Sequence, residues 1–262
     1  MAITTLDGLI ASAKCNVVLQ KTASITTVAN IPFSVFDQAG NPGAGTLSAG
    51  NTANGVVPTD ATAGYPLLAT PAATLYLNRI RAFSSVACWI DLYDTLFSCG
   101  AYSFNADTTL ASQPSYSSRL PNAGDYNGLE IWLEAVGAFT GNQTYQINYL
   151  DQDGNAGDSG SIASGVAPIA RRMLMVPLAA GDSGVQQITR VRSSVATVGT
   201  FNVHVMRWLW GCRINGANQG AFDSMLKSGL PKIFGDSALR MVITADSTAS
   251  GLPSMRMETA DG

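Results

Sequence analysis

The sequence has few charged residues: Asp, Glu, Lys and Arg make up 13% of its 262 positions, about half the share that is usual in soluble domains. It contains a single histidine, His204, and Asp60 is the only charged residue between Asp37 and Arg79. A soluble monomer normally depends on a charged surface of mixed sign. The shortage of charge therefore predicts a protein that partners cover in an assembly.

Other features that the sequence lacks exclude several classes of function. The formal net charge of −3 is too small to steer nucleic acid toward the protein. No run of 18 apolar residues is present, and residues 1–14 lack the pattern of a secretory signal, so we expect synthesis in the cytoplasm and no membrane partner. No Cys-x-x-Cys motif occurs, and we expect neither a metal nor a cofactor. The cysteines lie far apart, at Cys15, Cys88, Cys99 and Cys212.

The few charges are unevenly placed along the chain. Residues 82–170 contain nine acidic residues and one basic residue, Arg119, whereas residues 171–262 contain ten basic and six acidic residues. Ordinary variation in surface charge is one interpretation. The other is that the acidic middle of one copy contacts the basic C-terminal part of a neighbouring copy, an arrangement that fixes the register between subunits.

Two short helices are predicted from the spacing of apolar residues. The first covers residues 5–14, with Thr5 as N-cap and Asp7 in the first turn. A helix of this length is unstable alone, so it must dock on its own body or on another subunit. The second covers residues 219–227, with Phe222, Met225 and Leu226 on one face.

Alternating apolar and polar residues predict strands over most of the remaining chain. Turn residues such as Gly, Asn, Asp and Pro separate these segments. Many short strands with frequent turn signals indicate an all-β protein, a β-sandwich or jelly roll. The predicted strands are residues 16–27, 33–37, 74–83, 87–92, 129–136, 144–150, 172–177, 185–193, 201–210, 239–244 and 254–259.

We divide the chain into an N-terminal helix and arm, residues 1–30, and a β-sandwich or jelly-roll body, residues 31–262. The glycine-rich residues 39–54 are either an arm that lies on a neighbour or a long surface loop. A faint internal repeat is also visible: residues 79–81, Arg-Ile-Arg, resemble residues 190–192, Arg-Val-Arg, and residues 129–133 resemble residues 239–243. A duplicated sandwich is one explanation of this repeat, and chance is the other.

Two kinds of motif suggest chemistry that the rest of the sequence does not support. Gly-Asp-Ser-Gly occurs at residues 157–160 and 181–184, as in trypsin-like proteases, where the histidine base precedes the serine. Here His204 follows both stretches, in a strand pattern that favours a structural histidine. Residues 151–155 begin like a calcium loop, but Ala156 and Ile162 occupy the positions that need Gly and Glu. Turns explain these stretches better.

Two groups of residues are candidate binding surfaces. Glu130, Trp132 and Glu134 share one face of a predicted strand, which suits a carbohydrate-binding face or, less well, a glycosidase. Trp208 and Trp210 share a face of another strand, and tryptophan is a frequent anchor of protein interfaces. A position in the core is the alternative for either tryptophan.

Four stretches together carry a resemblance to a known group of proteins: FSVFDQAGNPGAGTL at residues 33–47, NYLDQDGNAG at 148–157, PLAAGDSGVQQI at 177–188 and GLPKIFGDSALRMVI at 229–243. In this order they resemble virion structural proteins of tailed bacteriophages, over most of the chain from about residue 20. The resemblance implies a capsid decoration (cement) protein, with a neck or tail component as the alternative. It implies no catalytic or ligand-binding residue.

These observations predict a non-enzymatic protein of the virion, made in the host cytoplasm, that stabilises the capsid lattice by bridging major capsid subunits. We expect a homo-oligomer, with a trimer favoured. The predicted partner contacts are Leu6, Leu9 and Ile10 on the first helix, and Trp208 and Trp210. A neck or tail component, or a carbohydrate-binding adhesin module that uses Glu130, Trp132 and Glu134, is the alternative.

Overall fold

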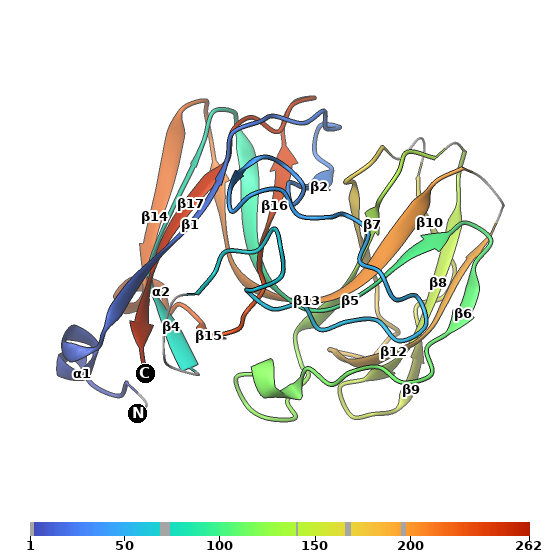
Figure 1. Cartoon of the computed structure of the whole chain (residues 1–262), viewed down its shortest axis with the longest axis horizontal. Coiled ribbons are helices and arrows are strands. Elements are labelled where there is room, and N and C mark those ends of the chain that lie inside the picture. Colours follow the sequence, from blue (N-terminus) through green and yellow to red (C-terminus); the bar gives the residue numbers. More distant parts are fainter. Residues whose placement is uncertain (1–2, 69–73, 140, 166–168, 195–197) are drawn as a thin grey trace. The chain divides into compact units, whose positions relative to one another are not determined.

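The computed structural model describes residues 3–68, 74–139, 141–165, 169–194 and 198–262. The described chain is all-β with two short helices, as the sequence predicts (Figure 1). None of its helices has the length and hydropathy needed to cross a bilayer. The strands are β1 Lys14–Lys21, β2 Pro32–Ser34, β3 Gly40–Asn41, β4 Thr74–Ser84, β5 Cys88–Ser103, β6 Asp107–Thr109, β7 Leu129–Ala135, β8 Thr144–Asp151, β9 Ala156–Asp158, β10 Ile162–Ala163, β11 Met173–Val176, β12 Val185–Ser194, β13 Thr200–Ile214, β14 Gln219–Ser224, β15 Lys232–Phe234, β16 Leu239–Ala245 and β17 Ser254–Asp261.

The chain divides into two compact units. Unit 1 contains residues 1–45, 59–94 and 209–262, and unit 2 contains residues 46–58 and 95–208. The long strands β5 and β13 have residues in both units. Residues 1–30, predicted as a separate arm, fall within unit 1, where β1 pairs with β17 along most of its length.

Unit 1 contains a sheet in the order β14-β4-β17-β1-β3, with β15 also paired to β4. Alternation along these strands gives the sheet one buried and one solvent-facing side. Leu75, Ile80 and Met257 are buried on one side, whereas Arg79 and Arg256 face solvent on the other. Strands β16 and β2 of a second sheet complete the unit, together with its residues of β5 and β13.

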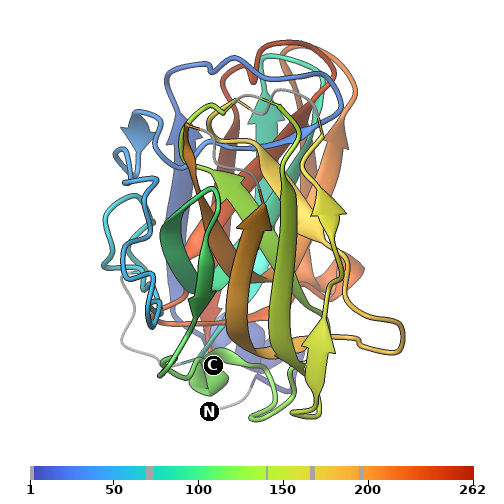
Figure 2. The same cartoon turned by 90° about the vertical axis from the view of Figure 1, so that its right-hand side faces the viewer.

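Unit 2 contains the sheet β10-β8-β12-β6, with β9 paired to β8, and these strands run side by side in Figure 2. Strands β7 and β11 of the second sheet pack with them over an aromatic core. The Tyr145 and Phe201 rings meet edge to face with centroids 4.9 Å apart, and Phe104 lies 4.3 Å from Phe139. Residues 39–54, left open as an arm or a loop, are divided between the units: residues 39–45 belong to unit 1, and residues 46–54 belong to unit 2, where the Ala49 amide donates to Asn202 Oδ1.

The two units repeat the same strand connectivity. Strand β12 pairs with β8 and β6, and β4 correspondingly pairs with β17 and β14. The second sheet has the order β11-β7-β13-β5-β16-β2. When each strand is replaced by its counterpart in the other unit, the same order results, read from the opposite edge. The counterparts are β2 and β11, β4 and β12, β5 and β13, β6 and β14, β7 and β16, and β8 and β17. The duplication of the sequence itself stays a prediction.

The predicted helix over residues 219–227 is wrong for most of its length. Residues 219–224 form β14, which pairs with β4 so that Phe222 lies opposite Arg81. Only Met225–Ser228 form a helix, α2, which ends at Gly229 in the left-handed conformation. The apolar spacing of Phe222, Met225 and Leu226 resembled a helical face because the strand passes directly into the helical turn.

The N-terminal helix is confirmed as α1, Leu6–Ala11, with the predicted cap. The Thr5 hydroxyl accepts a hydrogen bond of 3.0 Å from the Gly8 amide. The helix ends earlier than predicted because Lys14 already belongs to β1 and pairs with Ala260. The start of β1 at Lys14 therefore limits how far α1 extends along the chain.

Candidate functional site

A buried polar network lies in unit 2 where β5, β7 and β13 meet. The Ser98 hydroxyl lies 2.8 Å from His204 Nδ1, and His204 Nε2 lies 3.1 Å from Glu134 Oε2. Asn202 Nδ2 donates to the same carboxylate oxygen at 3.2 Å. His204 is 1% exposed and Glu134 is fully buried. Sequence reasoning predicted a structural histidine here, but its partners come from strands distant in sequence.

The order serine, histidine, carboxylate is that of a nucleophilic triad, yet the geometry suits structure better than catalysis. A nucleophilic serine must reach a substrate, whereas Ser98 is buried and its backbone amide and carbonyl both pair with Val56. The network therefore ties three strands and the 46–58 segment together. Its role is to satisfy buried polar groups, each of which is costly when unpaired.

The stretches that resembled protease and calcium motifs contain turns, although Gly157 and Asp158 of the first Gly-Asp-Ser-Gly stretch belong to β9. In the first Gly-Asp-Ser-Gly stretch, the Gly160 amide donates to Asp158 Oδ1 at 2.8 Å. In the calcium-like stretch, Asp151 Oδ1 accepts from the amides of Asp153 and Asn155, each at 2.8 Å. In the part of the chain that the structure describes, no group of three or more His, Cys, Asp and Glu residues could hold a metal ion.

The three residues of the predicted sugar face lie on β7, and two of them are buried. Trp132 is 6% exposed and its indole N–H donates to Glu130 Oε2 at 2.7 Å, while Glu134 belongs to the buried network. A sugar-binding platform needs an exposed aromatic face. Trp132 offers none in this structure, and the strand supplies only Glu130 to the surface.

The two predicted tryptophan contacts of β13 differ in exposure. Trp208, in unit 2, is half exposed, so its ring is accessible to a partner. Trp210, in unit 1, is buried, and its indole N–H donates to Asp223 Oδ2 at 3.3 Å. Of this pair, only Trp208 has the exposure that a contact residue needs.

The predicted contact residues of α1 line a groove on the solvent-facing side of the unit 1 sheet. Leu6 is 55% exposed and Ile10 is 70% exposed, while Leu9 is buried and anchors the helix. Phe222 of β14 and Leu226 of α2 are also exposed and line the same groove, whose volume is about 540 Å³. We call this surface, formed by Leu6, Ile10, Phe222 and Leu226, the apolar groove.

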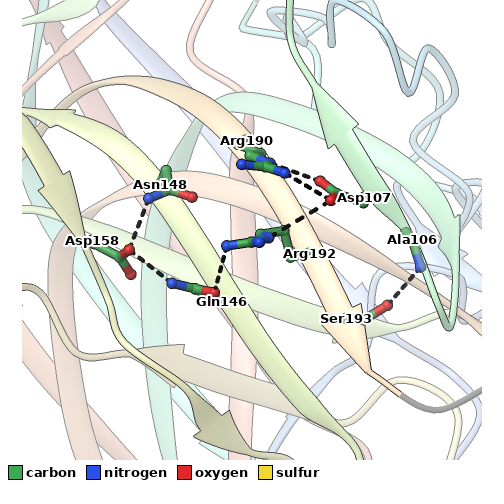
Figure 3. Close-up of polar contacts among 8 residues, drawn as sticks. All are labelled: Ala106, Asp107, Gln146, Asn148, Asp158, Arg190, Arg192 and Ser193. Atoms are coloured by element: carbon green, nitrogen blue, oxygen red, sulfur yellow. Dashed lines mark hydrogen bonds and ion pairs between the residues drawn. The ribbon is translucent and has the colours of Figure 1, made fainter.

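The solvent-facing side of the unit 2 sheet carries a polar network instead (Figure 3). Arg190 forms two hydrogen bonds of 2.7 Å with the Asp107 carboxylate, and Arg192 lies 3.8 Å from it. Arg192 also donates to Gln146 at 3.0 Å, and Gln146 in turn donates to Asp158 at 2.8 Å. These side chains satisfy one another's hydrogen-bonding groups across β6, β12, β8 and β9.

Hydrogen bonds lower the pKa of several exposed carboxylates below the ordinary aspartate value of 3.8. Arg190 is the main cause for Asp107, and Asn127 for Asp125. Because the folded pKa is below the unfolded one, each group adds stability above about pH 4 that disappears as pH falls through the folded pKa. We expect Tm to decrease from about pH 5 to about pH 3, and Asp107→Asn to reduce that decrease. Identical Tm profiles for the two proteins would contradict this account.

Comparison with known proteins finds only weak likenesses. No family model matches the chain, and no curated protein sequence matches it. Among solved structures, PirA is 13% identical, with 30% of this chain and 69% of that chain covered and a TM-score of 0.19. The infectious bursal disease virus Gt strain structure is 8% identical, with 95% and 81% covered and a TM-score of 0.19.

A carbohydrate-binding protein is a further neighbour. The family 30 carbohydrate-binding module of a Clostridium thermocellum cellulosomal cellulase is 12% identical, with 70% of this chain and 96% of that chain covered and a TM-score of 0.22. The neighbours thus include a viral particle protein and a binding module. At these TM-scores the likenesses support no argument about this chain.

Proposed function

We propose that the chain is a non-enzymatic structural protein of a tailed-bacteriophage virion that stabilises the capsid by bridging major capsid subunits. The observation that carries this proposal is the apolar groove. Exposed apolar side chains that gather at one place mark protein interaction sites. The groove includes Leu6 and Ile10, which the sequence singled out as contacts, and the charge-poor composition and the resemblance to phage virion proteins agree with this use.

The exposed side chains of the groove can supply binding energy for contacts in a lattice. Full burial of a leucine, isoleucine or phenylalanine side chain contributes about 1.5–3 kcal/mol. Leu6, Ile10, Phe222 and Leu226 are each at least half exposed before binding. Many copies held on one particle add avidity to a modest affinity per copy. A short helix whose buried Leu9 fixes it to the sheet then presents a preformed surface.

The double variant Leu6→Asp with Ile10→Asp is expected to bind capsids at least about tenfold more weakly, because each change removes apolar burial and adds a charge that must be desolvated. The measurement is cosedimentation with capsids assembled from the phage's major capsid protein. Both residues are exposed, so the free protein should keep its Tm.

Leu67→Asp is the matched control, because Leu67 is an equally exposed leucine of unit 1 outside the residues that line the groove. It should bind capsids like the wild type. Unchanged capsid binding by the double variant would overturn the groove assignment. Binding of the wild type to purified tails or necks and not to capsids would favour the neck or tail alternative.

A further inference from the structure

We propose that the solvent-facing side of the unit 1 sheet binds the acidic loops of unit 2 of a second copy of this chain. The binding residues are Arg79, Arg81 and Arg256, which we call the arginine row. The acidic loops are residues 121–128, 151–155 and 179–184. Arg79 also lines the apolar groove, whereas Arg81 and Arg256 lie outside it, and the proposed interface does not depend on capsid binding.

The equivalent arginine pair of unit 2 has an acidic partner that neutralises its charge. Arg190 and Arg192 of β12 correspond to Arg79 and Arg81 of β4, because the two strands have the same place in the connectivity. In unit 2, Asp107 lies opposite Arg192 and neutralises both arginines (Figure 3). Gln146, opposite Arg192 on the other side, accepts a further hydrogen bond.

In unit 1 the two neighbours that satisfy the arginines are replaced. The position of Asp107 is held by Phe222, opposite Arg81, and the position of Gln146 is held by Arg256, also opposite Arg81. Two like charges directly opposite each other destabilise a sheet. Glu258 is 3.9 Å from Arg79, but among the described residues neither Arg81 nor Arg256 forms an ion pair. The row therefore carries positive charge that an external anion can neutralise.

The surface around the row contains a hollow with an excess of positive charge. A shallow hollow of about 220 Å³ is lined by Arg79, Arg81 and Arg256 of two adjacent strands, together with Asn16, Met257 and Glu258, so three cationic side chains face it against one carboxylate. The Arg81 guanidinium lies 5.6 Å from the centre of the Phe222 ring, which holds it over the sheet. Arginine is one of the residues enriched at the energetic centre of protein interfaces.

The acidic loops of unit 2 offer the complementary charge. The Ser183 amide donates to Gln152 at 2.9 Å and the Gly128 amide donates to the Ser183 carbonyl at 2.7 Å, so the three loops lie side by side. Asp125 and Asp153 are exposed there. The three segments contain no lysine or arginine, so the loops themselves supply no cation that competes with the arginine row.

A second copy is therefore the occupant that the charges favour. Three arginines on a chain of net charge −3 are too few for a nucleic-acid surface, whereas the same chain carries exposed acidic side chains of opposite charge. The contact joins different surfaces of the two copies. Such a heterologous contact forms a ring when its rotation closes, which agrees with the expected homo-oligomer.

The test is the oligomeric state of the purified full chain, measured by sedimentation velocity. We expect oligomers at about 50 mM sodium chloride and their dissociation at about 500 mM, because screening weakens a contact between exposed charges. The variant with Arg81→Glu and Arg256→Glu should be monomeric at low salt, as should the variant with Asp125→Arg and Asp153→Arg. Arg190→Glu, at an equivalent position outside the interface, is the control and should still oligomerise.

Mixing the two monomeric variants gives the most specific result. Each retains one intact surface, so the pair should form a one-to-one heterodimer and nothing larger. A wild type that stays monomeric at low salt and high concentration would overturn the proposal, and so would oligomers that persist in the arginine variant. Capsid binding is measured separately, and neither Arg81 nor Arg256 lines the apolar groove, so failure of this proposal is distinguishable from failure of the proposed function.

Discussion

Replacing Glu134 by alanine is expected to lower the free energy of unfolding by about 3–5 kcal/mol, the usual loss when one partner of a buried polar pair is removed. Glu134 is fully buried and accepts from Asn202, while its Oε2 also lies 3.1 Å from His204. Alanine would leave these groups without their acceptor and would open space between β7 and β13. Urea denaturation at neutral pH measures the change directly.

Glu134→Gln separates the hydrogen bonds from the charge. Glutamine keeps the shape and one acceptor oxygen for Asn202, so we expect a smaller loss than with alanine. His204→Ala should resemble Glu134→Ala, and the double variant should cost less than the sum of the two, because both remove the same pair. A loss below about 1 kcal/mol for Glu134→Ala would show that the network contributes little to the fold.

Replacing Arg119 by methionine is expected to cost about 2–6 kcal/mol of unfolding free energy, from two buried carbonyls that lose their donor at about 1–3 kcal/mol each. Arg119 is 1% exposed, and its guanidinium donates to the carbonyl oxygen of Thr95 at 3.0 Å and to that of Pro58. Methionine fills much of the volume but donates nothing. Chemical denaturation monitored by tryptophan fluorescence provides the measurement.

Arg119→Lys is the informative control, because an ammonium group keeps the charge but lacks the planar fork that reaches two carbonyls at once. We expect lysine to restore part of the stability that methionine loses. Full stability with lysine would contradict the importance of the fork. Full stability with methionine would mean that Thr95 and Pro58 find other donors.

Local patterns in the sequence predicted most of the strands, because a half-buried strand alternates apolar and polar residues. Strands β4, β7, β8, β12 and β16 lie close to their predicted residues. The pattern failed at β14, whose pairing with β4 is a tertiary contact that residues 219–224 do not encode locally. It also missed the full length of β5, whose central residues are buried in succession and so do not alternate.

The candidate surfaces were only partly predictable for a related reason. Leu6 and Ile10 were identified from their helical spacing, because a helix this short must place its apolar side chains against its own body or against a partner. The Arg-Ile-Arg and Arg-Val-Arg repeat was visible, but its meaning depends on strand register: Asp107 lies opposite one arginine pair and Phe222 opposite the other. Register between distant strands follows from the fold and not from spacing along the chain.

Immunogold electron microscopy of the purified phage particles, with antibodies against this chain, tests the proposed function most directly. The proposal predicts gold label spread over the surface of the heads, with many copies on each particle. Particles without label, or label confined to the neck or tail, would contradict the assignment of this protein to the capsid.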